Sequence, residues 1–533
     1  MGLKFDGELR LTIVDWLFVL FSITLIFGLN PSVASDKCHA LIFVEPFLMA
    51  YCIFRILFVL NSKRTSYMIL FLITVFCLYE LFIGYTQLFQ NIGRNRGQDV
   101  ITGSFSGSGP LGCLLSVFCG LSIAVCVKTT RRFIRISLTV LSVISFVLMS
   151  CTLSRAAMIS FGVCMLFLGV KSEKTASFIR NYRALLLLIA ILLGSGAYLV
   201  KKPSADGRIL MARVGLRIMK ENGLSGIGLG NYAGAYGKTQ AEFFADYIES
   251  DDTDTGNVPE NLRITADSPA FCFNEFLRVG IECGPVSMLL LICMVVAGIA
   301  GTYKRDSVWC YPLISISVFA CFSYPFEVGV LVLLMTACLA ANDVKPDAKG
   351  TAILFFSLLC AALGSICYVR ICKSGMTIST SGVTFIERFC CNRHKTYLVH
   401  DCSPLQDGLY DERMLFALGQ SLNRNGEYEK SDEVLSLGTE ISSDPMFWNV
   451  MGNNSKALGK FREAESRYKS AFRMVPNRLY PLYLLAKLYY EEGDTVRFLE
   501  MEERMERFVP KVESVNTEKM RSEIRQLKCG TNK

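Results

Sequence analysis

Charged residues are scarce in this chain. Only 19% of its 533 residues are Asp, Glu, Lys or Arg, whereas 52% are hydrophobic and 37 are Phe. A soluble globular domain has about 25% charged residues. The composition therefore excludes an ordinary soluble protein of this length and indicates a membrane protein. The formal net charge of +8 is ascribed to membrane topology, and it gives no reason to expect a nucleic-acid partner.

Patterns typical of metal and dinucleotide sites are also missing. Most of the 21 cysteines fall within apolar segments, where Cys behaves as a small apolar residue. Cys390, Cys391 and Cys402 lack the second pair that a zinc site needs, although one disulfide among them stays open. The glycines between 223 and 237 lack the G-x-G-x-x-G spacing and follow no strand, so they indicate a closely packed, flexible turn. We expect no metal and no cofactor.

Long hydrophobic runs, in contrast, are abundant. A run of about 20 apolar residues spans a bilayer as a helix, because a helix satisfies its own backbone polar groups. We place eleven spans in residues 1–370 and predict an all-α, polytopic helical membrane domain. The predicted spans are 11–29, 40–60, 67–89, 110–127, 134–152, 153–170, 184–200, 277–300, 307–325, 326–342 and 351–369.

Basic residues orient these spans. Lys and Arg concentrate in alternate loops, whereas the short loops between them hold only Lys37, Arg94, Arg96 and Arg155. Because basic loops favour the cytoplasm, we expect the N-terminus inside and the large loop 201–276 outside. The C-terminal region also lies outside, and segment 11–29 is interpreted as a span, since it lacks a convincing cleavage site.

The C-terminal region contains an internal repeat. After a linker at 371–410, residues 411–533 carry small residues at Gly419, Gly452 and Ala486 and turn glycines at Gly426, Gly459 and Gly493. This spacing is typical of tetratricopeptide (TPR) repeats, in which stacked helix pairs bury a continuous core. We predict a TPR α-solenoid that binds a protein partner, with a stabilising cap as the alternative.

Several arginines fall on the predicted outer face. Arg155 interrupts the run "CTLSRAAMIS", where it either snorkels to lipid headgroups or clamps an anion. Arg208 follows Gly207 at an expected helix start, and Arg213 and Arg217 share a helical face with Lys220. Together with Arg94 and Arg96, these side chains would suit a lipid-linked diphosphate if they converge.

Six segments carry a resemblance to a known family. They are "ELFIGYTQLF" (80–89), "TGSFSGSGPLGCLLS" (102–116), "TLSRAAMIS" (152–160), "GRILMARVGLRIMKENGLSGIGLGNY" (207–232), "FNEFLRVGIECG" (273–284) and "SYPFE" (323–327). In this order, over residues 67–342, the chain resembles the O-antigen ligase/polymerase superfamily. Its repeat-containing tail is similar to versions common in Bacteroidetes-type bacteria.

The resemblance implies a metal-independent glycosyltransferase in the bacterial inner membrane. Such enzymes take a glycan from undecaprenyl diphosphate at the periplasmic face and pass it to lipid A–core (ligases) or to another glycan (polymerases), in lipopolysaccharide or polysaccharide assembly. We slightly favour the ligase. Arg155 and Arg208 match the family's Ser-Arg and Gly-Arg motifs and would hold the diphosphate leaving group. Arg94, Arg96, Arg213, Arg217 and Asn274 are predicted to bind substrate.

One position departs from the family pattern. Ligases carry a His-Asn element near the end of the large loop, and here Phe273 stands before Asn274. The three histidines, His39, His394 and His400, all lie outside that loop. Glu275 is the nearest alternative general base, followed by Asp267 and Glu282, with His39 as a distant one. A purely structural role for Glu275 at the start of a helix is the alternative.

Two other classes of protein stay open. Glu45, Arg55 and Glu80 lie inside predicted spans, where charges often serve transport, so a transporter of lipid-linked glycans is one alternative. Against it, no pair of related halves with matching broken helices is present. A catalytically silent scaffold for glycan assembly is the other, because the family histidine is missing.

Overall fold

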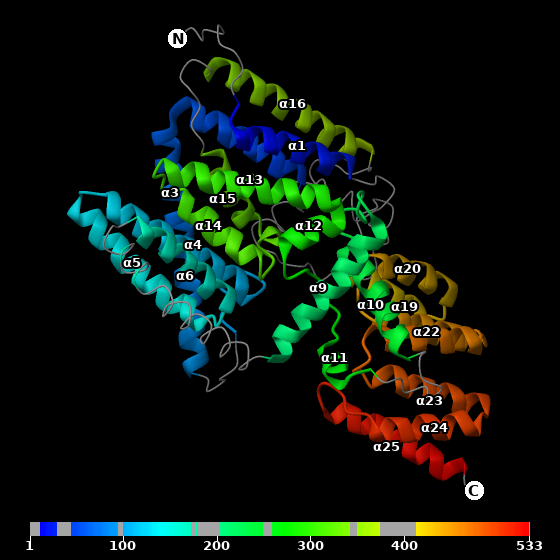
Figure 1. The fold of residues 1–533 in the computed structure, drawn as a ribbon. Coiled ribbons are helices and arrows are strands. Elements are labelled where there is room, and N and C mark those ends of the chain that lie inside the picture. The colour runs from blue at the N-terminus through cyan, green and yellow to red at the C-terminus, as the bar shows by residue number, and fades with distance from the viewer. Residues whose placement is uncertain are drawn as a thin grey trace. The chain divides into compact units, whose positions relative to one another are not determined.

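The chain is helical throughout its described parts. The structure, a computed structural model, describes residues 11–28, 44–93, 100–171, 202–248, 258–341, 349–373 and 412–531, with the single residues 177 and 181. Within these ranges all regular structure is helical, as predicted (Figure 1). Contacts divide the chain into two compact units, which are described separately.

The first unit contains the apolar helices. They are α1 (Ile13–Phe27), α3 (Glu45–Gly93), α4 (Ser108–Lys128), α5 (Arg132–Cys151), α6 (Arg155–Val170), α12 (Glu275–Cys283), α13 (Pro285–Lys304), α14 (Cys310–Ala320), the 3-10 turn η2 (Pro325–Glu327), α15 (Gly329–Ala340) and α16 (Lys349–Lys373). Four helical stretches are long and apolar enough to cross a membrane: Pro46–Asn91, Ser108–Lys128, Arg132–Cys151 and Pro285–Lys304. Range 184–200 falls outside the described residues, and the count of eleven spans stays a prediction.

Helix α3 covers two predicted spans and bends sharply between them. Asn61 has non-helical angles, φ −155° and ψ 89°. Thr65 Oγ1 lies 2.9 Å from the Leu57 carbonyl, although residues eight apart would be separated by about 12 Å along a straight helix. Asn61 Oδ1 accepts from the Arg64 amide at 3.0 Å, as an N-cap does. One residue therefore replaces the loop expected between the two spans.

A second break separates α12 from α13, inside the predicted span 277–300. Gly284 has φ 89°, which favours glycine, and Pro285 disfavours a helical conformation at the preceding residue. The candidate span therefore begins at Pro285. The predicted spans 307–325 and 326–342 contain only the shorter helices α14 and α15, with "SYPFE" between them.

Small polar residues allow three helices to meet at the centre of this unit. Ser116 in α4, Ser160 in α6 and Ser315 in α14 are fully buried. The Ser116 hydroxyl oxygen lies 2.9 Å from that of Ser160 and 2.8 Å from that of Ser315. Short hydroxyl side chains let helices approach closely while hydrogen-bonding between them. Helix α14 is consequently buried along almost its whole length.

A buried ion pair joins α1 to α3. Arg55 Nε and Nη2 donate to the two carboxylate oxygens of Asp15 at 2.8 and 2.9 Å, and both side chains are fully buried. Asp15 also accepts from Tyr51 Oη at 2.8 Å and forms the N-terminal capping box of α1 with Thr12. Arg55 Nη1 donates to the Ala340 carbonyl at the end of α15. The charge at Arg55 thus has a structural partner on another helix.

The helix ends of the first unit gather in two groups. One group comprises helix ends that the sequence assigns to the cytoplasm. The Trp309 indole donates to Ser66 there, and Asp306 pairs with Lys128 and Lys171. Close approaches of glycines join ends that the sequence assigns to the outer side: Gly28 with Cys283, and Gly107 and Gly109 with Tyr324 and Ser323. The grouping agrees with the predicted topology, whose orientation in a membrane stays a prediction.

The second unit combines the large loop with the C-terminal helices. Its helices are α9 (Lys202–Asn222), α10 (Tyr232–Ile248), α11 (Glu260–Thr265), α19 (Glu412–Arg424), α20 (Tyr428–Ile441), α21 (Met446–Ala457), α22 (Phe461–Met474), α23 (Tyr480–Glu492), α24 (Thr495–Arg507) and α25 (Val515–Thr531). Helices α19–α24 form three consecutive pairs (Figure 1). The loop and the predicted 411–533 domain therefore share one compact unit.

The repeat glycines lie where close packing and turns need them. A Cβ on Gly419 would lie 2.5 Å from Leu435, and one on Gly452 would lie 2.4 Å from the Tyr468 ring. Gly426, Gly459 and Gly493 end the first helix of each pair with φ of 81°, 73° and 77°. These features match the predicted repeat register, whereas assignment to the TPR class stays a prediction.

Helix α10 packs directly against the helix pairs. A Cβ on Gly234 would lie 1.9 Å from the Glu440 carbonyl, and one on Gly237 would lie 2.6 Å from Met474 and 3.0 Å from Ser443. The turn predicted for the glycines of 223–237 is thus wrong for these two, which are helical. It agrees with four others that have positive φ: Gly223, Gly226, Gly228 and Gly230.

Hydrogen bonds reinforce this contact. Gln240 Nε2 donates to the Met474 carbonyl at 2.5 Å. Lys238 pairs with Glu440 at 2.6 Å, and Asn477 Nδ2 donates to the Ala266 carbonyl at 2.7 Å. The C-terminal helices thereby hold α10 and the chain at Ala266.

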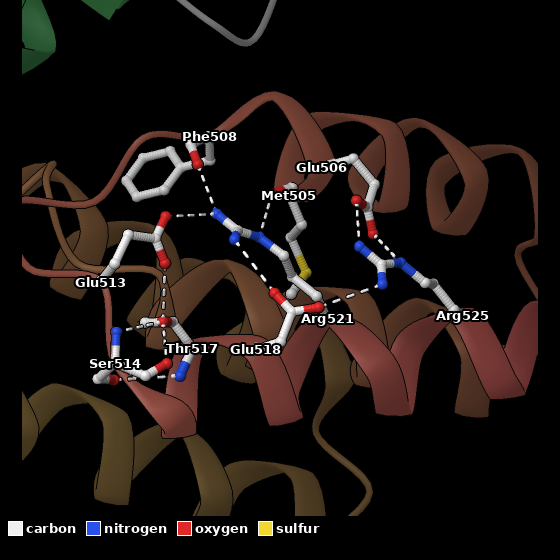
Figure 2. Close-up of polar contacts among 9 residues, drawn as sticks. All are labelled: Met505, Glu506, Phe508, Glu513, Ser514, Thr517, Glu518, Arg521 and Arg525. Atoms are coloured by element: carbon white, nitrogen blue, oxygen red, sulfur yellow. Dashed lines mark hydrogen bonds and ion pairs between the residues drawn. The ribbon is translucent and has the colours of Figure 1, made fainter.

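The last helix closes the array through two arginines (Figure 2). Arg521 donates to the carbonyls of Met505 and Phe508 at 3.2 and 2.7 Å, which satisfies groups left over at the end of α24. Arg525 forms a two-pronged ion pair with Glu506, with both distances 2.6 Å. These contacts anchor α25 to the end of α24.

Replacing Gly234 by Ala should disrupt the packing of α10. The added methyl group meets backbone that does not yield, at a cost of about 1–3 kcal/mol. Gly162→Ala is the matched control, because Gly162 lies in α6 with no neighbouring atom within 4 Å of the added group. We expect earlier thermal unfolding and faster proteolysis of the large loop for Gly234→Ala only. Equal behaviour of both variants would contradict the packing.

Asp15→Asn should destabilise the first unit strongly. It leaves the Arg55 guanidinium buried without a counter-charge, which costs about 3–5 kcal/mol. Asp306→Asn, at a carboxylate that is 59% exposed, should cost less than about 1 kcal/mol. Unfolding of the purified protein in increasing dodecyl sulfate would measure both, and similar midpoints for the two variants would argue against the buried pair.

Candidate functional site

The segment 100–107 overlaps the start of the motif segment 102–116. Two side chains of α3 hold it in place. Gln87 Oε1 accepts from the amides of Thr102 and Gly103 at 3.0 and 2.9 Å, while its Nε2 donates to the Gly103 carbonyl at 2.9 Å. Glu80 accepts from the amide and the hydroxyl of Ser104. Gly103 has φ 63°, and a Cβ there would lie 2.3 Å from the Glu80 carboxylate. The intramembrane charge at Glu80 therefore holds a loop.

Glycines after this segment bring two other motifs against it. A Cβ on Gly112 would lie 3.0 Å from Ser154 and 3.0 Å from Ala157, in the Ser-Arg motif. One on Gly107 would lie 3.3 Å from Tyr324 Oη, in the "SYPFE" segment. Five of the six motif segments are thus assembled in the first unit, and the sixth, 207–232, belongs to the second.

Arg155 is the first residue of α6, two residues after the start of the predicted span 153–170. The preceding turn is unusual, because Leu153 has φ 52° and its side chain is largely exposed. A non-glycine residue in this region is strained and marks a turn whose shape is needed. Arg155 also lies at the positive end of a helix dipole, where a cation does not stabilise the helix.

A second group of charges surrounds Arg278. Its guanidinium contacts Glu275 at 3.4 Å and Glu282 at 3.3 Å on α12, and it also pairs closely with Glu327 of η2. All four side chains are nearly buried, with Glu327 at 14% the most exposed. Three carboxylates around one guanidinium leave an excess of negative charge. We call Glu275, Arg278, Glu282 and Glu327 the acid cluster.

Glu275 has a raised pKa within this cluster. Its carboxylate is fully buried and accepts from the Phe326 amide at 3.0 Å. Burial raises its pKa to about 8, and the neighbouring Glu327 and Glu282 add to this, while Arg278 and the Phe326 amide oppose it. A group that titrates near neutral pH suits general acid–base chemistry. Its exclusion from water also suits the structural role that the sequence left open.

Residues 273 and 274 have local partners. The Phe273 ring meets the Tyr324 ring edge-on at 5.6 Å, so the position of the family histidine is filled by an aromatic contact. Asn274 caps α12, because its Oδ1 accepts from the Leu277 amide at 3.0 Å. The cap occupies one lone pair of the oxygen, and a substrate-binding role for Asn274 stays a prediction.

The remaining predicted arginines lie outside the described part of the first unit. Arg94 and Arg96 lie outside the described residues. Arg208 lies in the second turn of α9, which begins at Lys202 and not at Gly207 as predicted. Arg217 forms ion pairs with Glu221 at 2.9 Å and Asp246 at 3.0 Å, and Arg213 is exposed on the same helix. The substrate contacts proposed for these residues stay predictions.

The other candidate bases differ in environment. Asp267 pairs with Lys511 at 2.8 Å in the second unit. Burial raises its pKa, but hydrogen bonds from Lys511 and the Ser268 amide, together with the positive charges of Lys511 and Arg478, outweigh this and leave the pKa below its usual value. Glu282 belongs to the acid cluster, and His39 lies outside the described residues. Glu275 is therefore the candidate whose pKa best suits a base at neutral pH.

Two residues of the site went unnoticed in the sequence. Arg278 follows Glu275 by three residues and precedes Glu282 by four, a spacing that places all three on one helical face. Glu327 ends the "SYPFE" segment. No group of His, Cys, Asp or Glu in the described part of the chain has the arrangement of a metal site.

Comparison with known proteins identifies no relative. No protein-family model matches the chain, and neither a curated protein nor a solved structure is detectably similar to it.

Proposed function

We propose that the chain is a membrane glycosyltransferase of the O-antigen ligase/polymerase type. It would transfer a glycan from undecaprenyl diphosphate to an acceptor at the periplasmic face of the bacterial inner membrane. The observation that carries the proposal is the assembly of segment 100–107, the turn before Arg155, the start of α12 and "SYPFE" at one end of the first unit. These segments are remote in sequence, and all carry the resemblance.

The chemistry divides between two sets of side chains. Arg155 and Arg208 bind the diphosphate and stabilise the charge that develops as the glycosyl–phosphate bond breaks. Glu275 accepts the proton of the acceptor hydroxyl. This proton enters the acid cluster through Glu327, which is the most exposed carboxylate of the cluster. No metal or cofactor takes part in this scheme. Lipid A–core is the favoured acceptor, and a second glycan would make the enzyme a polymerase.

The contacts inside the first unit weigh against a transporter. Arg55 pairs with Asp15, and Glu80 holds segment 100–107, so two of the three intramembrane charges have structural partners, and the Glu45 side chain lies outside the described residues. A transport pathway would need such charges to face a cavity. The scaffold alternative rests on the absent histidine. Glu275, with its pKa of about 8, could replace that histidine as the general base.

The C-terminal helices have an intramolecular role in this scheme. By holding α10 and residues 266–269, they order the loop that carries Arg208. A protein partner for the predicted TPR domain would use a surface other than the parts of α20 and α22 that contact α10.

Arg155→Ala and Arg208→Ala should each lower the transfer rate without unfolding the protein. A hydrogen bond between charged groups contributes about 1.5–3 kcal/mol, which is roughly 10- to 100-fold in rate. The assay uses full-length protein in liposomes, labelled undecaprenyl-diphosphate glycan, and lipid A–core or a second lipid-linked glycan as acceptor. Arg132→Ala, at an exposed arginine that starts α5, is the control. Normal transfer by both arginine variants would refute the diphosphate clamp.

The transfer rate should rise with pH and level off near pH 8. A general base acts in its deprotonated form, so below its pKa the rate increases about tenfold per pH unit. Glu275→Gln should lower the rate and remove this dependence. Glu282→Gln removes a neighbouring negative charge, so it should keep the dependence but move its midpoint to lower pH. An unchanged profile in Glu275→Gln would exclude Glu275 as the base.

A further inference from the structure

A hollow lies at the other end of α4 and α6 from the proposed transfer site. It has a volume of about 810 Å³ and is formed where α4 and α6 end and where α13 passes into α14. Its lining comprises Ala124, Val127, Lys128, Leu168, Lys171, Tyr303, Lys304, Asp306 and Tyr311. The proposed transfer reaction uses none of these residues.

Positive charge exceeds negative charge around this hollow. Lys128 pairs with one oxygen of Asp306 at 2.7 Å, and Lys171 pairs with the other. Lys304 adds a third ammonium group, so three positive charges face one carboxylate. Hydrogen bonds from Lys128 and Lys171 hold the pKa of Asp306 below its usual value, so the carboxylate stays charged. Among the described residues that line the hollow, positive charges therefore exceed negative charges by two at neutral pH.

The lysines are both oriented and accessible. Lys128 also donates to the Asp306 backbone carbonyl, and the Lys171 ammonium lies 4.7 Å from the centre of the Tyr303 ring. Their side chains are 32% and 25% exposed. An ammonium group has three donors, so each lysine keeps at least one for a ligand.

Tyr311 supplies an independent indication of a ligand. It lines the hollow from α14, it is 1% exposed, and its hydroxyl has no hydrogen-bond partner in the described structure. A buried hydroxyl without a partner is unfavourable and calls for an explanation. An acceptor oxygen in the hollow would satisfy it, and phosphate oxygens are acceptors that also attract lysines.

The neighbouring surface fits the rest of a lipid. An apolar groove of about 640 Å³ between α4, α5 and α6 shares Val127 with the hollow. Ile123, Val143, Phe146 and Phe161 line this groove. A headgroup phosphate in the hollow would therefore leave an acyl chain beside an apolar surface.

We propose that this hollow binds the phosphate of an anionic membrane phospholipid, through Lys128, Lys171, Lys304 and the Tyr311 hydroxyl. The site lies at the helix ends opposite Arg155 and does not depend on the proposed glycan transfer. Asp306 occupies the two lysines when the lipid is absent and competes with its phosphate.

Native mass spectrometry of the full-length protein in detergent tests this proposal. The protein is titrated separately with phosphatidylglycerol, phosphatidylcholine and inorganic phosphate. We expect phosphatidylglycerol to bind about tenfold more tightly than phosphatidylcholine, as one additional charge-assisted contact predicts. Lys128→Gln combined with Lys171→Gln should abolish this preference, and Tyr311→Phe should reduce it. Binding of inorganic phosphate with the same lysine dependence, but no preference between the lipids, would reject a lipid ligand in favour of a free anion.

A variant that is expected to strengthen lipid binding controls for misfolding. Asp306→Asn removes the competing carboxylate and should strengthen the binding of phosphatidylglycerol, which a damaged protein would not do. Arg132→Gln removes a basic residue near the same helix ends but outside the hollow, and it should leave the preference unchanged. Weaker binding by Asp306→Asn, or an undiminished preference in the double lysine variant, would overturn the proposal.

Discussion

The satisfaction of backbone amides wherever a helix breaks is the constraint on which the apolar unit depends. In an apolar environment an unpaired amide is costly, and side-chain oxygens pair several of those exposed at the breaks. Asn61 accepts from residue 64, Gln87 and Glu80 accept from residues 102–104, and Glu275 accepts from residue 326. The polar residues within the apolar runs are therefore largely explained by the breaks that they close. Two of these breaks, at residues 102–104 and 326, lie at the end of the unit where the resembling motifs meet.

Much of the helical architecture followed from the sequence, because apolar runs and glycine spacing are local properties. The break before α13 was also readable, since Gly284 and Pro285 both oppose a continuous helix. The pairing of Arg55 with Asp15 could not be predicted from the sequence. The two residues are 40 positions apart, and nothing in the spacing selects one distant carboxylate over another. The same holds for Gly234. The glycines near it in sequence predicted a turn, whereas Gly234 lies in a helix, where the Glu440 backbone leaves no room for a side chain.

The candidate site shows the same division. Arg155 was placed at the start of a helix from its sequence context alone, and Glu275 was singled out because it follows Phe273. Its environment depends on Arg278 and Glu327, and only the first shares its helix. The pKa of Glu275 thus depends on Arg278 and Glu282, which the spacing along α12 reveals. It also depends on Glu327 in a distant turn, which the spacing does not reveal.

The contact between α10 and the C-terminal helices also bears on how the protein is made. Lys238 and Glu440 are 202 residues apart, so at a synthesis rate of 5–20 residues per second the loop waits about 10–40 s for its partner. Helices α13–α16 are synthesised during that interval. Until then α10 exposes the glycine face that later receives residues 440–443 and Met474. Biogenesis of this protein therefore includes a late step, in which α10 acquires its final packing only after residues 440–474 have been synthesised.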